Sequence, residues 1–463
     1  MLSRHWMIRI LLFSVMLLCV VAVTCTAAFC FEVTPSMKAL IAKNESLGLK
    51  KFPISFWSYT NLRQHGEHMT EAEVKSWADA GFTVPQSPTF DPKNKAEKAH
   101  IIKILQWADK YGMKLILTDP RGYAQIGKDG KAAATYADGI QAAVKDFGKY
   151  PALFGFHVGD EPGANIKDAF FECCRLQKEA APKLHPFANL LPYFPWILDI
   201  AGTDTWPHYL DEYAKKTNAD LVGYDCYVQM NPGDDGWNVY YQNLKYNREA
   251  SLRNGIPFWN TILSVGHYNY RVPNQDELKW QFNTSIASGA NGIVYFYYYV
   301  REPEANYRMS PVDEHWEKTI TYYSIQRYQK SFHRRYGDLF NHLASTRVTF
   351  VNKAFGEGEL FTPDDLIQKI DCGPTDIMVV GEFTDANGKR YAMFVNNSMT
   401  NNTQFHITFP KGSRIFSLDW WNHEYEGGAY CCNGYANDAE GNPLHHIFLA
   451  PGQEAVYRVE LAK

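Results

Sequence analysis

Short apolar runs alternate with longer amphipathic segments along most of the chain from residue 52 onward. Apolar runs of about four to eight residues beside Gly or Pro are typical of buried strands, whereas apolar residues spaced three and four apart are typical of helices. This pattern predicts strands at 52–59, 82–85, 113–118, 153–158, 187–191, 221–224, 257–263 and 292–298. Helices are predicted at 71–80, 95–111, 132–149, 167–180, 210–216, 240–254, 275–288 and 314–343.

The regular alternation of strands and helices limits the fold class. Its period, and its length of about 290 residues, are those of an α/β fold of the (β/α)8 TIM-barrel type. An open, doubly wound sheet is the alternative, but no glycine-rich phosphate-binding loop follows the first strand, which ends near Tyr59. We therefore expect a barrel in which the carboxyl ends of all strands meet at one face.

The pattern changes after Ala344. Short segments in which apolar and polar residues alternate recur at 377–383, 390–396, 403–409 and 454–460, and turn residues such as Pro451-Gly452 separate them. Such segments are typical of antiparallel strands. The sequence therefore predicts a barrel domain over 29–344 and a C-terminal antiparallel β-sandwich over 345–463.

The first 28 residues have the composition of a signal peptide. Basic residues precede the apolar run 10–23, and the small residues Thr26, Ala27 and Ala28 follow it. We expect cleavage after Ala28 and a secreted or periplasmic protein. A lipid anchor at Cys25 is an alternative that Thr24 disfavours. No later segment is long and apolar enough to predict a membrane span.

Composition narrows the choice of partners. The formal net charge is −4 and no basic stripe is present, so we expect no nucleic-acid partner. No Cys or His spacing is typical of a metal site, and neither a metal nor a cofactor is predicted. Aromatic residues make up 15% of the chain, and aromatic faces are suited to stacking against sugar rings. The oligomeric state is not predicted.

Two adjacent acids end the fourth predicted strand. The run Leu153–Val158 is followed by Gly159, Asp160, Glu161 and Pro162. Polar residues at the carboxyl ends of barrel strands are where catalytic groups gather. Mutual repulsion and burial separate the pKa values of two such acids and can leave one protonated near neutral pH, as a general acid requires. The alternative is a helix-capping Asp beside a solvated Glu.

The other predicted strand ends add carboxylate, aromatic and hydrogen-bonding side chains, a mixture that suits a neutral, polyhydroxylated carbohydrate substrate. The last strand contributes Arg301 and Glu302 as well as tyrosines. The candidate catalytic residues are Glu161, Asp160 and Asp225. The candidate substrate-binding residues are Trp57, Asp119, Arg121, Trp196, Tyr224, Tyr227, Trp259, Asn260, Tyr297 and Tyr299.

Residues 50–345 resemble the secreted (β/α)8 glycoside hydrolases whose fourth strand ends in Asn-Glu-Pro; here the motif is Asp160-Glu161-Pro162. The resemblance implies that Glu161 is the general acid/base of a glycosidase. The sequence departs from this clan at Asp160, which replaces the Asn. It also departs at Ile262, which stands where the nucleophilic Glu of the seventh strand is expected.

The run His157-Val158-Gly159-Asp160-Glu161 is also similar to that of hexosaminidases that use the acetamide group of the substrate as nucleophile. This resemblance implies that Asp160 orients the acetamide while Glu161 protonates the leaving group. The pair Tyr224-Asp225 resembles a pair that chitinases place against the N-acetyl group. Two alternatives stay open: Asp225 as the base of an inverting hydrolase, and a barrel that binds carbohydrate without catalysis.

Overall fold

The computed structural model describes residues 31–233, 236–299, 306–418, 421–427 and 432–462. The chain divides into two units, Met1–Glu32 and Val33–Lys463, and the fold described below belongs to the second. The predicted signal peptide, 1–28, and the residues Arg301 and Glu302 of the eighth predicted strand lie outside the described residues.

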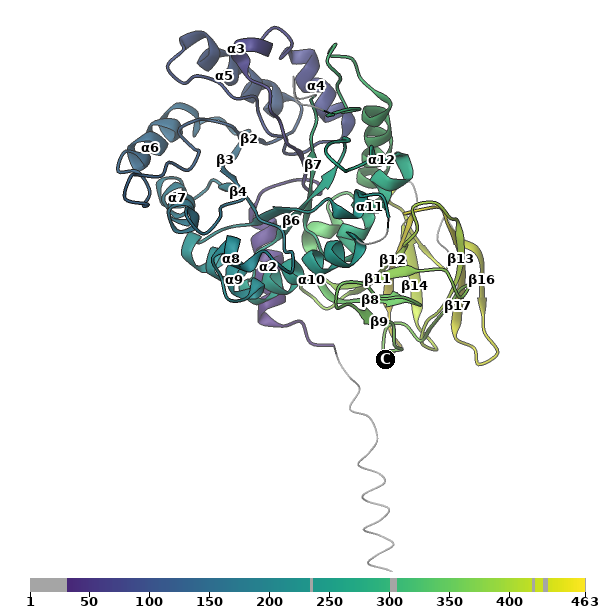
Figure 1. Cartoon of the computed structure of the whole chain (residues 1–463). Coiled ribbons are helices and arrows are strands. Elements are labelled where there is room, and N and C mark those ends of the chain that lie inside the picture. Colours follow the sequence, from purple (N-terminus) through teal and green to yellow (C-terminus); the bar gives the residue numbers. More distant parts are fainter. Residues whose placement is uncertain (1–30, 234–235, 300–305, 419–420, 428–431, 463) are drawn as a thin grey trace, which may run out of the picture. The chain divides into compact units, whose positions relative to one another are not determined.

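A curled parallel sheet forms the first part of the fold (Figure 1). Its strand order is β1-β7-β6-β5-β4-β3-β2, and each neighbouring pair is parallel. The strands are β1 (Ile54–Phe56), β2 (Leu115–Leu117), β3 (Leu153–Asp160), β4 (Phe187–Leu190), β5 (Val222–Asp225), β6 (Phe258–Leu263) and β7 (Gly292–Phe296).

The segment predicted as a strand at 82–85 closes the sheet into a barrel without being a regular strand. The amides of Thr83 and Val84 donate to Ile54 O in β1. On its other side, Thr83 O and Pro85 O accept hydrogen bonds from Lys114 and Ile116 at β2. Pro85 lacks an N–H group and so interrupts the ladder. The fold class is therefore the predicted TIM barrel, with one irregular member.

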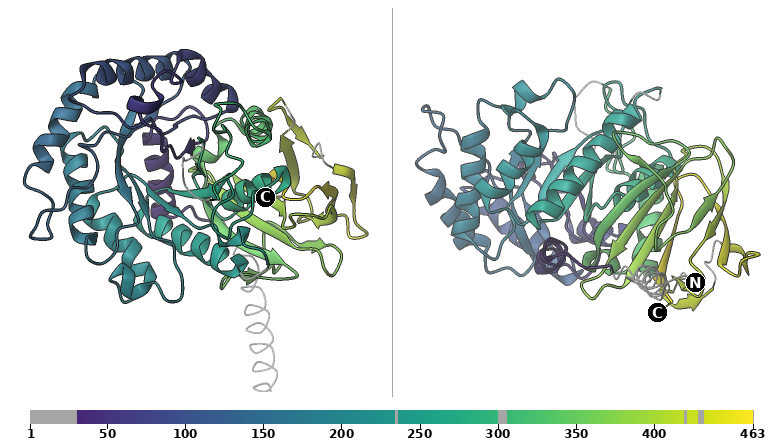
Figure 2. Two further views of the ribbon diagram at one scale, coloured as in Figure 1. Left: turned by 45° about the horizontal axis from the view of Figure 1, so that its top comes forward. Right: turned by 90° about the horizontal axis from the view of Figure 1, so that it is seen from below.

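Helices cover the outer face of the barrel sheet (Figure 2). α12 begins at Ile320, where Thr319 caps it, and not at residue 314 as predicted. α9 begins at Trp206 and not at residue 210, because Thr205 caps it and Pro207 favours its first turn. The helices are α2 (Pro35–Ser46), α3 (Leu62–His65), α4 (Glu71–Ala80), α5 (Lys95–Lys110), α6 (Tyr136–Phe147), α7 (Lys167–Ala180), α8 (Leu198–Ala201), α9 (Trp206–Thr217), α10 (Gly236–Asn254), α11 (Gln275–Ala287) and α12 (Ile320–Tyr336), with 3-10 turns η1 (Val228–Met230) and η2 (Leu339–His342).

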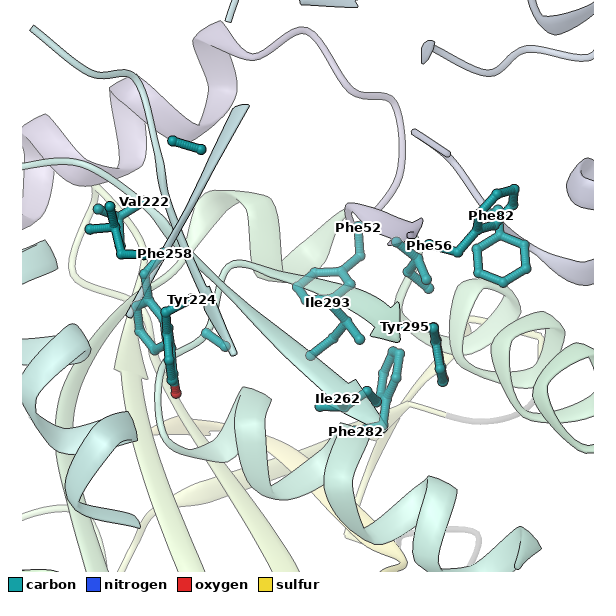
Figure 3. Close-up of a cluster of buried hydrophobic side chains, with 14 of the residues drawn as sticks. Phe52, Phe56, Phe82, Val222, Tyr224, Phe258, Ile262, Phe282, Ile293 and Tyr295 are labelled. Carbon is teal, nitrogen blue, oxygen red and sulfur yellow. The ribbon is translucent and has the colours of Figure 1, made fainter. Parts of the chain in front are cut away.

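Two apolar layers hold the barrel together. Side chains that point inward, among them Phe154, Phe187 and Trp259, fill the barrel interior. Side chains that point outward, such as Tyr224 and Ile262, pack beneath the helices (Figure 3). Successive side chains of a strand alternate between its two faces. The layer to which a side chain belongs therefore shows whether it can reach the rim of the barrel. No helix among the described residues has the length and apolar character needed to cross a bilayer.

Two further sheets follow the barrel and face each other across a separate apolar core, which includes Val380, Phe394, Phe405 and Tyr457. One has the order β10-β13-β17-β16 and the other β15-β14-β18-β12-β11-β8-β9, and every pair except β8–β9 is antiparallel. The strands are β8 (Ala344–Val351), β9 (Glu359–Leu360), β10 (Lys369–Asp371), β11 (Met378–Thr384), β12 (Arg390–Asn396), β13 (Thr403–Thr408), β14 (Arg414–Leu418), β15 (Glu424–Glu426), β16 (Cys432–Asn437), β17 (Pro443–Leu449) and β18 (Glu454–Glu460).

A buried ion pair joins the sandwich to the barrel helices. Glu454, at the start of β18, accepts a hydrogen bond of 2.7 Å from Arg335 in α12, and both side chains are 4% exposed. Asn283 in α11 donates to the other carboxylate oxygen at 2.7 Å. Tyr328 and Tyr336 also donate to this carboxylate. Glu454 thus connects two barrel helices to the sandwich.

Candidate functional site

A β-bulge near the end of β3 sets the direction of Asp160. His157 is paired with Phe187 and Asp160 with Asn189, and the register shifts between His157 and Gly159. Phe187 and Asn189 are two residues apart and share one face of β4, so the bulge places Asp160 on the same inner face as His157. Gly159 has a φ of 144°, and a Cβ there would lie 2.9 Å from the Phe170 ring. Glycine is therefore required at the bulge.

Asn189 joins two acids from different strands. Its Nδ2 donates to Asp160 Oδ1 at 2.9 Å and to Asp225 Oδ1 at 2.7 Å. The amide oxygen of Asn189 accepts a hydrogen bond of 3.5 Å from Thr261 in β6. The partner of Asn189 in β5 is Gly223, which has no side chain in the way. Four consecutive strands, β3 to β6, thus contribute one polar side chain each to a single network.

Glu161 stands beside this network in an unusual backbone conformation. Its φ is 44°, in the left-handed region that non-glycine residues rarely adopt, and its N–H donates to Asn189 O at 2.9 Å. The Glu161 carboxyl lies against the side chain of Asp225, a contact that lowers the pKa of Glu161. Strained residues of this kind cluster at functional sites.

Burial is the main cause that raises the pKa of all three acids. Glu161 remains accessible to solvent, but surrounding protein atoms remove part of its hydration. This loss of hydration, followed by the adjacent charge of Asp160, raises the pKa of Glu161 to about 7. Loss of hydration also raises the pKa of Asp160, and the Asn189 hydrogen bond opposes it. Burial, followed by the charges of Glu161 and Asp160, raises the pKa of Asp225 well above its ordinary value. A proton is therefore held within this cluster near neutral pH.

The proximity of Glu161 and Asp225 bears on one alternative that the sequence left open. Asp225 belongs to a strand two places away in the sheet from the strand that precedes Glu161. That spacing predicted room between the two acids for the water molecule that an inverting base activates. Inverting glycosidases separate their two carboxyl groups by roughly 6.5–9.5 Å, whereas these two lie against each other. This proximity disfavours the inverting alternative, which the stereochemistry of hydrolysis tests.

The orientation of β6 explains the departure at Ile262. Ile262 is 0% exposed and packs in the layer beneath the helices, near Phe282 of α11 (Figure 3). Trp259 and Leu263 point into the barrel instead, and Thr261 shares their face. A side chain at 262 could not reach the acids, and the residue that β6 presents to them is Thr261, which is not a carboxylate.

Several side chains predicted to bind substrate are buried away from the rim, and for these the prediction is wrong. Trp259 is 0% exposed and packs between Phe154 and Phe187 inside the barrel. Asn260 points outward and donates to Ser285 of α11 at 2.8 Å. The others are Tyr224, in the layer beneath the helices, Tyr297, fully buried with its ring edge-on to Tyr59, and Tyr299, bonded to Glu73 and Trp77 of α4.

Asp119 and Arg121 form ion pairs within the protein. Asp119 is 0% exposed and accepts hydrogen bonds from the Arg121 guanidinium, including one of 2.7 Å from Nη2. The remaining terminal nitrogen of Arg121 donates to Asp146 of α6 at 2.9 Å. This ion-pair network fixes the loop after β2 to a helix, so the predicted contact of these two residues with substrate is corrected.

Of the other predicted aromatic residues, one lies beside the acids, one is exposed at the surface, and one is buried in the barrel interior. Tyr227 lies beside Asp225, whose pKa it lowers, and stacks on Phe296 with a centroid distance of 5.2 Å. Trp57 lies in the barrel interior with its ring 4.8 Å from His157. Trp196, in the loop after β4, is 63% exposed. Within the described residues, no group of three His, Cys, Asp or Glu side chains is arranged to hold a metal ion.

Asn189 is the functional residue that sequence reasoning missed. It lies within an apolar strand of the sequence Phe-Ala-Asn-Leu and is 2% exposed. A polar residue inside such a run is the signal that could have identified it, because a buried amide needs partners. Tyr123 was missed as well: its pKa is raised to about 12, mainly by burial and in small part by the charge of Asp160.

The proximity of Asp160 and Glu161 predicts a measurable titration. We expect the Glu161 carboxyl to titrate near pH 7, and Asp160→Asn to lower its pKa because one negative charge is removed. Carbon-13 NMR of labelled carboxyl groups measures both values. Asp168→Asn, an exposed acid on α7, is the control and should leave the Glu161 titration unchanged. Glu161 titrating near its ordinary value of 4.5 would contradict the electrostatic description.

Comparison with known proteins gives the fold and no family. No family model and no curated protein matches the sequence. Solved structures that the chain resembles include a β-galactosidase from Bacillus circulans sp. alkalophilus, with TM-score 0.58, 10% identity, and 89% of this chain and 99% of that chain covered. A glycoside hydrolase family 5 protein from Bacteroides vulgatus has TM-score 0.53, 11% identity, and coverage of 88% and 89%.

A family 39 glycoside hydrolase from Bacteroides cellulosilyticus has TM-score 0.50, 11% identity, and coverage of 90% of this chain and 82% of that chain. Against three further β-galactosidases this chain spans 56%, 59% and 58% of their length. At these identities the likeness concerns the fold alone. The chain thus has the TIM-barrel fold of these glycoside hydrolases.

Proposed function

We propose that the protein is a secreted or periplasmic glycoside hydrolase in which Glu161 is the general acid. The observation that supports this most directly is the network in which Asn189 joins Asp160 and Asp225 beside Glu161. A carboxylic acid with a pKa of about 7 is protonated for a large part of the time near neutral pH and can donate its proton to a glycosidic oxygen. The location rests on the predicted signal peptide.

We further propose that the substrate supplies the nucleophile. Thr261 and not a carboxylate occupies the inner position of β6, and Glu161 and Asp225 lie too close together to enclose the reacting carbon. An N-acetyl group on the substrate removes the need for a protein nucleophile. Its carbonyl oxygen attacks the anomeric carbon while the bond to the leaving oxygen breaks, and that oxygen takes the Glu161 proton. Asp160, oriented by Asn189, accepts the acetamide N–H and stabilises the positive charge of the cyclic intermediate.

Glu161, then ionised, accepts a proton from the water that opens the cyclic intermediate, and the cycle closes with retained configuration. We expect kcat/KM to fall as pH rises through about 7, because deprotonation of Glu161 removes the acid.

Paired substrates test the proposal. With the same aryl leaving group, we expect N-acetylhexosaminides to be cleaved and the matching plain hexosides to be stable. A thiazoline analogue should inhibit because it resembles the cyclic intermediate, and such analogues bind more tightly than substrates by about 10²-fold or more. Proton NMR of the anomeric signal during hydrolysis reports the stereochemistry.

Two outcomes would contradict the proposal in different ways. Cleavage of a plain hexoside with inversion would assign Asp225 the role of base and exclude the acetamide route. No cleavage of any glycan across a broad panel, together with binding, would favour a carbohydrate-binding barrel without catalytic activity.

A further inference from the structure

A cavity of about 570 Å³ lies where loops of the barrel meet loops of the sandwich. Barrel residues on its wall follow β5 and β6, the strands that present Asp225 and Thr261. Sandwich residues come from the connections after β8, before β11 and after β12. The residues that carry the argument are Gln229, Asn231, Trp237, Arg271 and Asn397. None of them belongs to the acid network described above.

Asn397 presents a buried hydrogen-bond donor in this wall. Its Oδ1 accepts hydrogen bonds from Tyr241 Oη at 2.7 Å and from Trp280 Nε1 at 2.8 Å. An indole N–H can only donate, so the oxygen of the amide must face it and the Nδ2 group is fixed on the other side. Asn397 is 2% exposed, and its Nδ2 has no hydrogen-bond partner.

Gln229 presents a buried acceptor in the same wall. Gln281 is held by the β6 backbone: Leu263 N–H donates to its Oε1 and its Nε2 donates to Leu263 O. Gln229 Nε2 donates to that Oε1 at 3.1 Å, which fixes the Gln229 amide. Gln229 is 1% exposed, and its Oε1 has no hydrogen-bond partner.

A buried donor and a buried acceptor, each held in one orientation, are costly unless a ligand or water satisfies them. A hydroxyl group can do both at once, because it donates and accepts. Asn231 adds a second unpartnered amide oxygen, and half-buried Trp237 adds aromatic surface. The charge of Arg271 is balanced by Glu277 in the same wall, and the wall holds one further residue of each sign, Lys353 and Asp376. The wall therefore favours a neutral polyhydroxylated ligand with an apolar face.

We propose that this cavity is a second, non-catalytic binding site for a neutral saccharide unit. Its volume is within the range of about 300–1,000 Å³ that is usual for small-ligand sites. Gln229 follows Tyr227 closely in the chain, and Tyr227 lies beside Asp225, so the site adjoins the loop next to the acids. The choice of a sugar as ligand rests on the proposed function, whereas the fixed donor and acceptor do not.

Glycan binding by the full-length protein tests this proposal. The background is Glu161→Gln, so that bound oligosaccharides persist, and the probe is an immobilised panel of neutral oligosaccharides. We expect Trp237→Ala and Gln229→Leu each to lower the apparent affinity for the bound glycan about tenfold. Trp107→Ala, which removes an equally half-buried Trp from α5, is the matched control and should have no effect. Thermal unfolding verifies that each variant folds.

A measurement on the Glu161→Gln protein without cavity substitutions is independent of the folding of those variants. A bound glycan carrying a diazirine should label peptides that contain 228–237 and 397–403. Labelling confined to peptides around 157–161, no change of affinity in the folded cavity variants, or no glycan bound at all would overturn the proposal and leave a cavity that holds water only. Loss of binding in the cavity variants of a protein that hydrolyses nothing would instead refute the proposed function and leave this site standing.

Discussion

Glu161→Gln is expected to abolish hydrolysis of glycosides with poor leaving groups, with a loss of about 10²–10⁴-fold in kcat/KM. The amide N–H protons are not acidic enough to be transferred to the leaving oxygen, while the shape of the amide preserves the hydrogen-bonding surroundings. Substrates with a dinitrophenyl leaving group need little protonation and should lose much less. Steady-state kinetics on both substrate types measures the difference.

Glu179→Gln is a suitable control for this experiment. Glu179 lies on the outer surface of α7, where it pairs with Arg175 and its side chain is 60% exposed. We expect its replacement to leave hydrolysis unchanged. Equal losses on good and poor leaving groups in Glu161→Gln would show that Glu161 does not act as the acid. A variant with normal kinetics would place the acid elsewhere in the molecule.

The largest effect on stability is expected from Glu454→Ala, which should lower the free energy of unfolding by about 3–5 kcal/mol. The change removes the carboxylate that balances the buried Arg335 charge and accepts from Asn283, Tyr328 and Tyr336. Chemical denaturation monitored by tryptophan fluorescence measures the loss. Because the ion pair joins the barrel helices to the sandwich, the two parts should also unfold less cooperatively.

Glu460→Ala on the same strand is the control. Glu460 is exposed and pairs with Arg414 and Arg458, and exposed pairs contribute about 0–1 kcal/mol. A second variant that replaces Arg335 and Glu454 together by Leu should recover part of the stability, since it leaves no buried charge. Equal destabilisation by Glu454→Ala and Glu460→Ala would mean that the buried pair does not join the two parts.

Local pattern was sufficient for most elements of the fold. α4 and α7 have the predicted bounds because Thr70 caps the first and an apolar stripe runs through both. Segment 82–85 was predicted as a regular strand and is not one. It lies in the predicted place in the barrel, but Pro85 interrupts its hydrogen-bond ladder. The start of α12 was misplaced because a helical period in sequence does not show where the cap at Thr319 ends the preceding loop.

The acid pair could be identified from the sequence alone because Asp160, Glu161 and Pro162 interrupt an apolar strand at its carboxyl end. The direction in which the neighbouring side chains point could not be identified from the sequence alone. Tyr224 in β5 and Asn260 and Ile262 in β6 point beneath the helices. The alternation of side chains along a strand does not show which of its two faces will lie inside the barrel. Only the bulge between His157 and Gly159 decides that Asp160 points inward.

Contacts between distant segments were decided by the tertiary structure alone. Asn189 reaches Asp225 over Gly223, and this contact depends on strand register, which no local pattern specifies. The contact between Glu161 and Asp225 depends on the same register. The sequence by itself therefore determined the barrel, the strand ends and the acid beside Pro162. The closure of the barrel decided which side chains meet, because their distances depend on strands brought together from far along the chain.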